Sequence, residues 1–413
     1  MLEIIVIAYT FYTLLKVYIS VMQIGFVSNE ITKEPVLMDK ENFVQAGKYT
    51  ISKEHSSIVG NLVDYLFFIA WISFGFKMLL DSFGIDDNSI LSSLLFLFGF
   101  IAVNWIVGLP FEIYQAFKLD KDYGFSEMTP KLFILDQLKS IAIFLILGGG
   151  LFSLFIWIIS SFENWWLWSF VLMMSIIFLA NVIYPTLIAP LFNKFSPLED
   201  GELKNKIESL MSGVGLESNG IFTMDASKRD NRLNAYFAGM GKSKRVVLFD
   251  TLIKKLSPDE LLAVLGHELG HFLHGDIWKN MAMIAVLLFG AFFIIGNLPE
   301  SLYFEMGLEA HAGVKIAIMM MIFPLISFFF LPIMSLMSRH NEYEADKYAL
   351  SQSTGASNLV NALIKLVGEN KSFPKSHPLV IFFFYSHPPI LERLKALGYE
   401  DKLLEKEGIF SYL

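Results

Sequence analysis

Residues 140–160 read SIAIFLILGGGLFSLFIWIIS and carry no charged side chain. A run of about 20 apolar residues is long enough to cross the hydrocarbon core of a bilayer as one helix. Six more runs of this kind lie near residues 2–24, 57–83, 90–114, 166–192, 280–298 and 316–338. We therefore expect a mainly α, polytopic membrane protein with seven transmembrane helices.

The overall composition agrees with a chain that lies largely in a lipid bilayer. Of the 413 residues, 54% are hydrophobic and 17% are charged, whereas soluble domains have about 25% charged residues. The formal net charge of −8 argues against nucleic acid as a partner. Cysteine is absent, which excludes disulfides, thiolate metal ligands and a cysteine nucleophile.

Loop charges predict how the chain is oriented in the membrane. The first apolar run contains Lys16 and follows no basic segment, so we interpret it as a retained span and not as a signal peptide. Basic residues gather in the loops on one side of the membrane, at Lys33, Lys40, Lys48, Lys53, Lys118, Lys121, Lys131 and Lys139. Only Lys77 and Lys315 lie in loops on the other side. Short basic loops stay in the cytoplasm, so we expect the N-terminus outside and the C-terminus inside.

Four polar residues interrupt the apolar runs: Lys16, Asp64, Asn104 and Asn181. Polar groups at membrane depth face other helices or a water-filled cavity. Two interpretations therefore stay open, namely hydrogen bonding between helices and an aqueous chamber between the spans.

The polar stretch between the fifth and sixth runs has mixed secondary structure. Residues 201–213 have the pattern of a helix. Residues 245–249 are rich in β-branched and aromatic side chains and predict a strand. Residues 234–238 predict a second strand, with a turn at 239–242. This stretch is expected to form a small α+β unit.

A capped helix in that unit carries the residues with the clearest chemistry. Ser257, Pro258 and Glu260 have the pattern of a capping box with proline at the first helical position. The helix then contains His267 and His271, which lie one turn apart on one face and can share a metal ion. Glu268 follows the first histidine and could take a proton from a water that Zn²⁺ activates. Two surface histidines on an ordinary helix are the simpler alternative.

A catalytic zinc site needs a third protein ligand. The metzincin class of proteases is excluded, because Ile277 stands where the metzincin pattern needs a histidine. His274 is offset from His267 and His271 on the helix, so we expect it to be solvated or outside the ligand set. Glu342 is the better candidate, with Asp346 one turn later to accept the outer N–H of a ligand histidine. The alternative is that these acids form a solvated face of a helix that leaves the membrane.

A histidine close to the C-terminus is the last candidate. His387 precedes two prolines, which restrict the backbone and can start a helix. A histidine held rigidly near zinc could donate a hydrogen bond to the oxyanion of a tetrahedral intermediate. A lone His-Pro pair is more often an ordinary turn.

Together these motifs resemble the type I CAAX prenyl protease family, which consists of integral-membrane zinc metalloproteases of the gluzincin type. The resemblance covers most of the chain, at residues 109–114, 123–126, 136–140, 189–198, 201–204, 234–236, 267–271, 342–346 and 386–389. It implies seven tilted helices around a large chamber, capped by a small α+β zinc-metalloprotease domain. It also implies prenylated CAAX-type peptides or proteins as substrates.

The resemblance further implies a role for each candidate residue. One Zn²⁺ per chain would be held by His267, His271 and Glu342, with Glu268 as the general base. Asp346 would support a ligand histidine, and His387 would stabilise the oxyanion. Arg393 would belong to the same polar network as these residues. The peptide substrate would bind along an edge strand formed by Asn234, Ala235 and Tyr236. Selectivity would then depend on a lipid group in the chamber.

The predicted organisation has four parts. Residues 1–192 hold five transmembrane helices, 193–279 the cytoplasmic zinc region, 280–338 the last two spans, and 339–413 a cytoplasmic region with the third ligand and His387. Residues 409–413 contain no dilysine-type retrieval signal. We therefore expect a bacterial cytoplasmic membrane, or the endoplasmic reticulum membrane if the source is eukaryotic.

Three other functions share some of these sequence features. A heat-shock membrane protease would share the zinc motifs, but such chains are shorter and have fewer spans before the zinc helix. A channel or transporter with structural zinc would suit seven spans with internal polar residues. A scaffold without activity would have no need of Glu268. The sequence favours a zinc endopeptidase.

Overall fold

The computed structural model describes residues 1–84, 89–213, 220–239, 245–352 and 356–399. Within these residues, seven helical segments are long and apolar enough to cross a membrane. They are Leu2–Glu30, Lys40–Phe83, Ile90–Asp122, Pro130–Ser161, Trp165–Phe192, Asp276–Gly296 and Ala312–Ser351. The predicted fold class, a polytopic and mainly α membrane protein, is confirmed.

Several of these segments join α-helices through short π-helical turns, a feature that is often found near functional sites. The first five segments consist of α1 (Leu2–Glu30), α2 (Lys40–Ala70), η1 (Trp71–Gly75), α3 (Phe76–Phe83), α4 (Ile90–Tyr114), η2 (Gln115–Leu119), α5 (Asp120–Asp122), α6 (Pro130–Ile143), η3 (Phe144–Gly148), α7 (Gly149–Ser161), α8 (Trp165–Ile183), η4 (Tyr184–Ile188) and α9 (Ala189–Phe192). The last two are α13 (Asp276–Gly296) and α15 (Ala312–Ser351).

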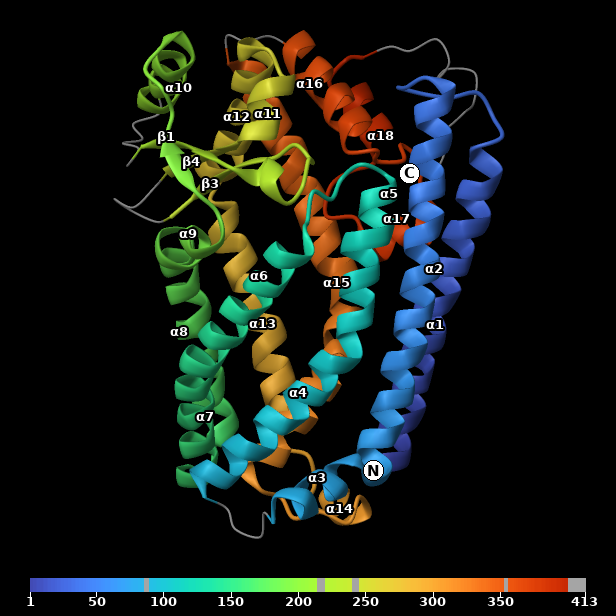
Figure 1. The fold of residues 1–413 in the computed structure, drawn as a ribbon, viewed down its shortest axis with the longest axis vertical. Coiled ribbons are helices and arrows are strands. Elements are labelled where there is room, and N and C mark those ends of the chain that lie inside the picture. The colour runs from blue at the N-terminus through green and yellow to red at the C-terminus, as the bar shows by residue number, and fades with distance from the viewer. Residues whose placement is uncertain (85–88, 214–219, 240–244, 353–355, 400–413) are drawn as a thin grey trace.

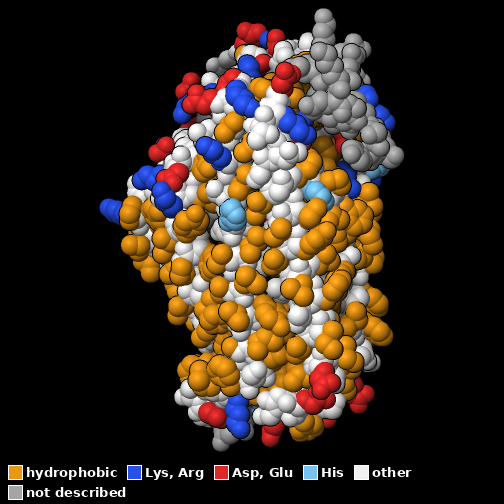
Figure 2. All heavy atoms as spheres, turned by 90° about the vertical axis from the view of Figure 1, so that its right-hand side faces the viewer, with side chains coloured by type: hydrophobic (Ala, Val, Ile, Leu, Met, Phe, Trp, Pro, Cys, Tyr) orange, Lys and Arg blue, Asp and Glu red, His pale blue; other side chains and the backbone are white. Residues whose placement is uncertain are grey.

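The molecule has two distinct ends along its long axis. The long helices run side by side, and the sheet lies at the end opposite to the N-terminus (Figure 1). The remaining helical elements are α10 (Glu202–Ser212), η5 (Ala226–Lys228), α11 (Asp250–Lys255), α12 (Pro258–Leu273), α14 (Ser301–Glu305), α16 (Ala356–Glu369), α17 (Pro378–Phe384) and α18 (Ile390–Ala396). On the face in Figure 2, hydrophobic side chains cover the middle of the molecule and charged ones gather at the ends, as a membrane-spanning protein requires.

A four-stranded sheet builds the polar end. Its strands are β1 (Phe195–Pro197), β2 (Ile221–Met224), β3 (Ala235–Ala238) and β4 (Arg245–Phe249), in the order β1-β2-β4-β3. Strand β4 is central and has Val246, Val247 and Leu248 fully buried, and it pairs parallel with β2 and antiparallel with β3. Both predicted strands and the helix at 201–213 are confirmed, while most of the predicted turn at 239–242 lies outside the described residues.

The first two spans extend further than the apolar pattern predicts. Helix α1 continues to Glu30 and α2 begins at Lys40, so most of the polar stretch between the apolar runs near residues 2–24 and 57–83 is helical. Asp39 explains the early start of α2, because its side chain accepts a hydrogen bond from the N–H of Asn42 as an N-cap. Glu30 is buried against Lys375 at 2.9 Å, which keeps the end of α1 in contact with the C-terminal region.

The polar residues inside the spans serve both of the expected purposes. Asn104 accepts a hydrogen bond from Trp71 at 3.3 Å, which joins two spans. Asn104 and Asp64 also line a cavity of about 820 Å³, together with Tyr9 and Tyr12 of α1 and residues of α15. Asn181 instead donates to its own helix at the carbonyl of Ile177. The helices therefore enclose an interior space with polar groups on its wall.

Candidate active site

Two helices that are far apart in the sequence pack closely and create the site. Helix α12 has the predicted capping box, in which Ser257 and Glu260 each accept from the other's backbone N–H. Gly270 faces α15, where an added Cβ would lie only 2.9 Å from the Cα of Ala345. Glycine at this position therefore lets α12 approach α15 closely enough for side chains from both helices to meet.

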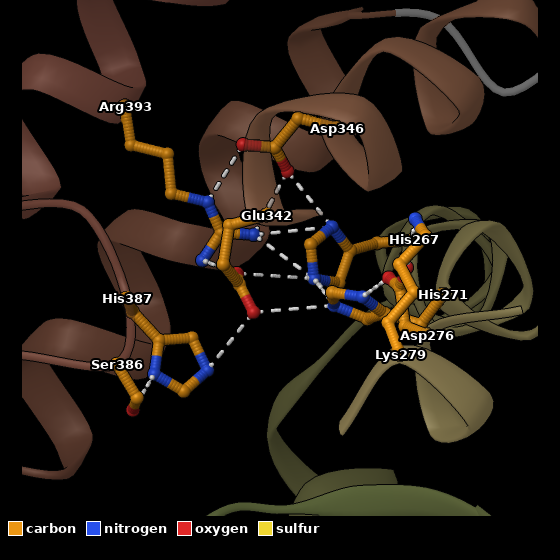
Figure 3. Close-up of polar contacts among 9 residues, drawn as sticks. All are labelled: His267, His271, Asp276, Lys279, Glu342, Asp346, Ser386, His387 and Arg393. Atoms are coloured by element: carbon orange, nitrogen blue, oxygen red, sulfur yellow. Dashed lines mark hydrogen bonds and ion pairs between the residues drawn. The ribbon is translucent and has the colours of Figure 1, made fainter. Parts of the chain in front are cut away.

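That approach brings His267, His271 and Glu342 together (Figure 3). The Nε2 atoms of the two histidines are 3.1 Å apart. One carboxylate oxygen of Glu342 lies 3.2 Å from Nε2 of His271, and the other lies 3.4 Å from Nε2 of His267. His267 and Glu342 are buried, so the predicted third ligand is in contact with the histidine pair and is not on a solvated face.

These three residues have the chemistry of a zinc site. Two imidazole nitrogens and one carboxylate are the donor set of catalytic zinc centres of the His₂Glu type, and one donor atom of each residue lies within 4.8 Å of the others. Oε2 of Glu342 is buried and accepts no hydrogen bond in the described structure. Burial lowers the pKa of His271, but hydrogen bonds to Glu342 and Asp276 outweigh it and raise the pKa to about 9. The site therefore favours positive charge, which a divalent cation supplies.

Each histidine has a carboxylate on its outer nitrogen. Nδ1 of His267 lies 2.8 Å from Asp346, which agrees with the role expected for Asp346. Nδ1 of His271 lies 2.8 Å from Asp276, a contact that the sequence analysis missed. Such partners orient a ligand histidine and fix its tautomer.

The contact of Asp276 with His271 does not follow from sequence spacing, because the position of Asp276 depends on a backbone reversal. Gly275 has φ +67°, a left-handed conformation that glycine adopts readily, and it redirects the chain from α12 into α13. Asp276 also contacts Lys279 at 2.7 Å, and Lys279 lies 3.4 Å from the side chain of buried Asn341. In the sequence, the Gly275-Asp276 pair just after the zinc helix is the feature that could have indicated this contact.

Arg393 links the two acidic residues of α15. Its guanidinium donates to both oxygens of Asp346 at 2.7 and 2.8 Å, and it lies 3.2 Å from Glu342. Arg393 comes from α18, the helix that follows the two prolines after His387. A bidentate arginine–carboxylate pair fixes geometry as well as charge, so α18 and α15 are held in one relative position at the site.

His387 lies on the other side of Glu342 (Figure 3). Its Nε2 is 3.2 Å from Oε1 of Glu342, and its Nδ1 is 3.0 Å from Ser386. The turn that carries it is held by Arg339, which donates to the carbonyls of Ile381 and Tyr385 at 2.9 and 2.7 Å. The structure therefore brings His387 into contact with Glu342, the candidate ligand from α15.

A small cavity of about 160 Å³ lies beside the site. It is lined by Asn234, Ala235 and Glu268, together with the apolar side chains of Leu233, Leu252, Val264, Leu359, Leu363 and Leu366. Burial raises the pKa of Glu268, although the neighbouring His267 and His271 oppose the rise. A carboxylate with a raised pKa is a better proton acceptor than an ordinary one. Tyr236 follows on β3, which is the edge strand of the sheet.

His274 takes no part in the group of candidate ligands. Its ring instead lies near Tyr348, with 6.3 Å between ring centroids. The expectation that this histidine is outside the ligand set therefore agrees with the geometry.

Comparison with known families decides where this site belongs. Residues 197–401 match the family model described as "Peptidase family M48", and residues 29–194 match "CAAX prenyl protease N-terminal, five membrane helices". The chain belongs to peptidase family M48. The region matched by the second family model begins at the end of the first span, Leu2–Glu30, and contains the next four spans that precede the zinc helix.

Relatives of this M48 peptidase match over nearly its whole length. "CAAX prenyl protease 1 homolog" of Arabidopsis thaliana is 35% identical over 390 residues, with 89% of each chain covered. "CAAX prenyl protease 1" of Saccharomyces cerevisiae is 36% identical over 413 residues, with 90% of this chain and 89% of the relative covered. The crystal structure of Ste24p from S. mikatae superposes with a TM-score of 0.89 at 32% identity and covers 96% of this chain and 99% of its own.

The M48 protein is therefore a membrane zinc metallopeptidase, as the resemblance predicted. The helical bundle with its interior space and the small sheet domain agree with the structural relative.

Proposed function

We propose that this M48 peptidase hydrolyses a peptide bond near the C-terminus of prenylated CAAX-type substrates at the cytoplasmic face of a membrane. The observation that carries the proposal is the contact of Glu342 with His267 and His271, beside an edge strand and at the end of a membrane-spanning bundle. The curated relatives of this length are named as CAAX prenyl proteases.

One Zn²⁺ per chain would be held by His267, His271 and Glu342. When bound there, it would polarise the peptide carbonyl and lower the pKa of a water molecule to about 7. Glu268 then takes the proton of the attacking water, for which its raised pKa and its place in the cavity are suitable. The same carboxyl group can pass the proton to the leaving amine.

The other polar and charged residues of the site would stabilise the developing negative charge or position the ligand side chains. His387 lies next to Glu342 and can donate a hydrogen bond to the carbonyl oxygen as negative charge develops there. Asp346 and Asp276 would orient the two ligand histidines through their outer nitrogens. Arg393 holds Asp346 and lies beside Glu342, so it keeps the carboxylates in place.

The substrate peptide would bind along β3, at Asn234, Ala235 and Tyr236. An edge strand binds an extended peptide through its main chain and so accepts many sequences. The neighbouring cavity has an aliphatic part, formed by leucines and Val264, beside a polar part that includes His267 and Glu268. The aliphatic part suits an aliphatic residue next to the scissile bond. A prenyl group in the space between the spans would then provide selectivity for lipidated substrates.

The predicted orientation places this site on the cytoplasmic side of the membrane. The basic loop residues are more numerous at the end of the bundle that also carries the sheet, which supports retention of that end in the cytoplasm. We propose a bacterial cytoplasmic membrane as the location, or the endoplasmic reticulum membrane if the source is eukaryotic.

A direct test compares a farnesylated CAAX peptide with the same peptide lacking the lipid, using purified protein in detergent. Zinc-dependent cleavage that strongly favours the farnesylated peptide, is lost with a chelator and returns with Zn²⁺ is the expected result. Equal rates on both peptides would instead favour the heat-shock type of general quality-control protease. Bound zinc without cleavage of either peptide would favour a structural metal in a channel or transporter.

A further inference from the structure

One face of α1 carries polar side chains that are buried against the C-terminal region. Gln23 and Glu30 are only 2% and 5% exposed, and their spacing of two helical turns places them on the same face. Burying an amide or a carboxylate costs free energy unless the group is hydrogen-bonded. The partners of these two side chains therefore indicate what this face of α1 holds in place.

The carboxamide of Gln23 binds two consecutive residues of the C-terminal region. Its Oε1 accepts from the backbone N–H of His377 at 2.8 Å, and its Nε2 donates to the hydroxyl of Ser376 at 3.0 Å. Because a backbone N–H can only donate, the first contact also fixes which end of the carboxamide faces Ser376. Gln23 therefore holds the chain at the start of α17, whose N-cap residue is His377.

Two further contacts hold the same stretch against α1. Lys375 lies 2.9 Å from Glu30, and both side chains are buried. The rings of Phe26 and His377 meet nearly at right angles, with 6.0 Å between their centroids. We refer to Lys375, Ser376 and His377 together as the α1 anchor. A buried polar network whose members are paired rigidifies the chain that carries it.

The α1 anchor is also connected to the other end of α17. The hydroxyl of Ser376 shares a hydrogen bond with the hydroxyl of Tyr385, the residue that follows α17. Because the Ser376 oxygen already accepts from Gln23, its own hydrogen is available to Tyr385. Two successive hydrogen bonds thus lead from α1 to Tyr385.

Tyr385 lies two residues before His387, and its backbone is held as well. Arg339 of α15 donates to the carbonyl of Tyr385 at 2.7 Å. On the far side of His387, two prolines restrict the backbone through their fixed φ. The side chain of Tyr385 is therefore held by α1 and its backbone by α15, and both contacts limit the turn that carries His387.

His387 needs this support more than the buried side chains of the site do. Its side chain is 64% exposed, whereas that of Glu342 is 5% exposed. An imidazole with so little packing around it depends on its backbone for a fixed position. A donor to an oxyanion is effective only when it is preorganised at about 3 Å from the developing charge. The turn before His387 is therefore the part of the site where a fixed backbone matters most.

We propose that Gln23 is a positioning residue for His387. This inference rests on the proposed function, in which His387 stabilises the oxyanion, and it gives the first span a part in catalysis. Residues 2–28 of α1 lie outside both regions that the family models match. The candidate zinc ligands come from α12 and α15, so the contribution of α1 concerns the oxyanion and not the metal.

The main test compares Gln23→Ala with wild type, using purified protein and the farnesylated CAAX peptide. Because a misplaced group loses much of its effect on the transition state, kcat should fall by about tenfold while KM stays within about twofold. Zinc content, measured by elemental analysis, should equal that of the wild type. Unchanged kcat, or loss of zinc together with activity, would overturn the proposal.

Thr10→Ala is the matched control on the same helix. It removes a hydrogen bond of 2.8 Å from α1 to Tyr65 of α2 and should keep kcat within about twofold of wild type. A fall in kcat as large as that of Gln23→Ala would show that any loosening of α1 slows the reaction, and it would overturn the specific role of Gln23.

A double-mutant cycle with His387→Ala separates positioning from a general loss of packing. If Gln23 acts through His387, Gln23→Ala should lower kcat by less than about twofold once His387 is absent. Multiplication of the two single effects would contradict the proposal. Tyr385→Phe removes only the hydroxyl that Ser376 binds and should give the same pattern with a smaller fall in kcat. If Gln23→Ala does not fold, unchanged kcat in Tyr385→Phe overturns the proposal in its place.

The same cycle distinguishes this inference from the proposed function. Wild-type kcat in His387→Ala would show that the oxyanion role of His387 is wrong, and the inference would be overturned with it. A fall of about a hundredfold in His387→Ala, together with no effect of Gln23→Ala or with an independent one, would overturn the inference alone.

Discussion

Single residues at this site act in pairs that join two helices. His267 and His271 would have little hold on a metal without Glu342 from α15, and each has its own carboxylate, Asp346 or Asp276. The group therefore combines ligands with residues that orient them, and the two kinds of residue should respond differently to substitution.

Glu268 is expected to serve the reaction and not the metal. Glu268→Gln keeps the size and polarity of the side chain but removes the proton acceptor. We expect loss of at least about a thousandfold in kcat with zinc content unchanged, because no other described carboxylate lines the small cavity. Activity assays and elemental analysis of the same preparation test this. Full activity in the variant would remove Glu268 from the mechanism.

Asp276 is expected to act through His271. Asp276→Asn should weaken zinc binding by about 10- to 100-fold, since the outer carboxylate that orients the histidine is lost. Competition with a chelating dye gives the affinity directly. Glu344→Gln, at a residue of α15 paired with Lys347, is the control and should bind zinc as the wild type does. Wild-type zinc affinity in Asp276→Asn would show that the 2.8 Å contact has no positioning role.

At the scale of elements, helix α12 depends on its capped start. Glu260 closes the capping box with Ser257 and lies 2.8 Å from Lys365 of α16. Burial opposes ionisation, but these hydrogen bonds lower the pKa of Glu260 below its ordinary value. A lowered pKa means that the carboxylate stabilises the fold above its ordinary pKa, and that this stabilisation is lost as the pH falls through the folded value.

Two substitutions separate the charge of Glu260 from its hydrogen bond. At pH 7, Glu260→Gln should cost about 1 kcal/mol, and Glu260→Ala should cost more because the box is lost as well. The difference between wild type and Glu260→Gln should shrink as the pH drops below about 4. Thermal unfolding in detergent across this pH range provides the measurement. A constant difference at all pH values would contradict the assigned role of the charge.

At the scale of the whole molecule, ion pairs join the sheet to the membrane helices. Arg229 donates to both oxygens of Asp136 on α6 at 2.8 and 2.9 Å, and both side chains are largely buried. Arg232 binds Asp120 close to the end of α4. The segment that leads into β3 is thus fixed to two of the helical segments long enough to cross a membrane, so β3 is held in a defined position relative to them.

Breaking the Arg229–Asp136 pair should therefore loosen the connection between the two parts. Asp136→Asn is expected to cost about 2 kcal/mol, because Arg229 loses its ionic partner and keeps only its hydrogen bond to Asn193 at 3.1 Å. The exposed pair Lys206–Asp259, at 3.5 Å, provides the control, and Asp259→Asn should change stability by less than about 1 kcal/mol. Comparable small effects in both variants, measured by unfolding in detergent, would show that the buried pair is not a structural link.

Elements with local sequence signals could be predicted before the fold was known. Seven apolar runs, the capping box at Ser257 and the spacing of His267 and His271 depend on neighbouring residues only, and all of them are found in the structure. The predicted lengths of the first two helices were too short, because both helices continue through polar residues beyond the apolar pattern.

Tertiary structure decided which distant residues meet. The close packing at Gly270 brings Glu342 to the histidine pair, the left-handed Gly275 turns Asp276 toward His271, and Gln23 of α1 reaches Ser376. None of these contacts follows from spacing, because each depends on how two separate helices or segments approach one another. Local patterns in a chain define its elements, whereas the relative placement of those elements is set by the packing of the whole molecule.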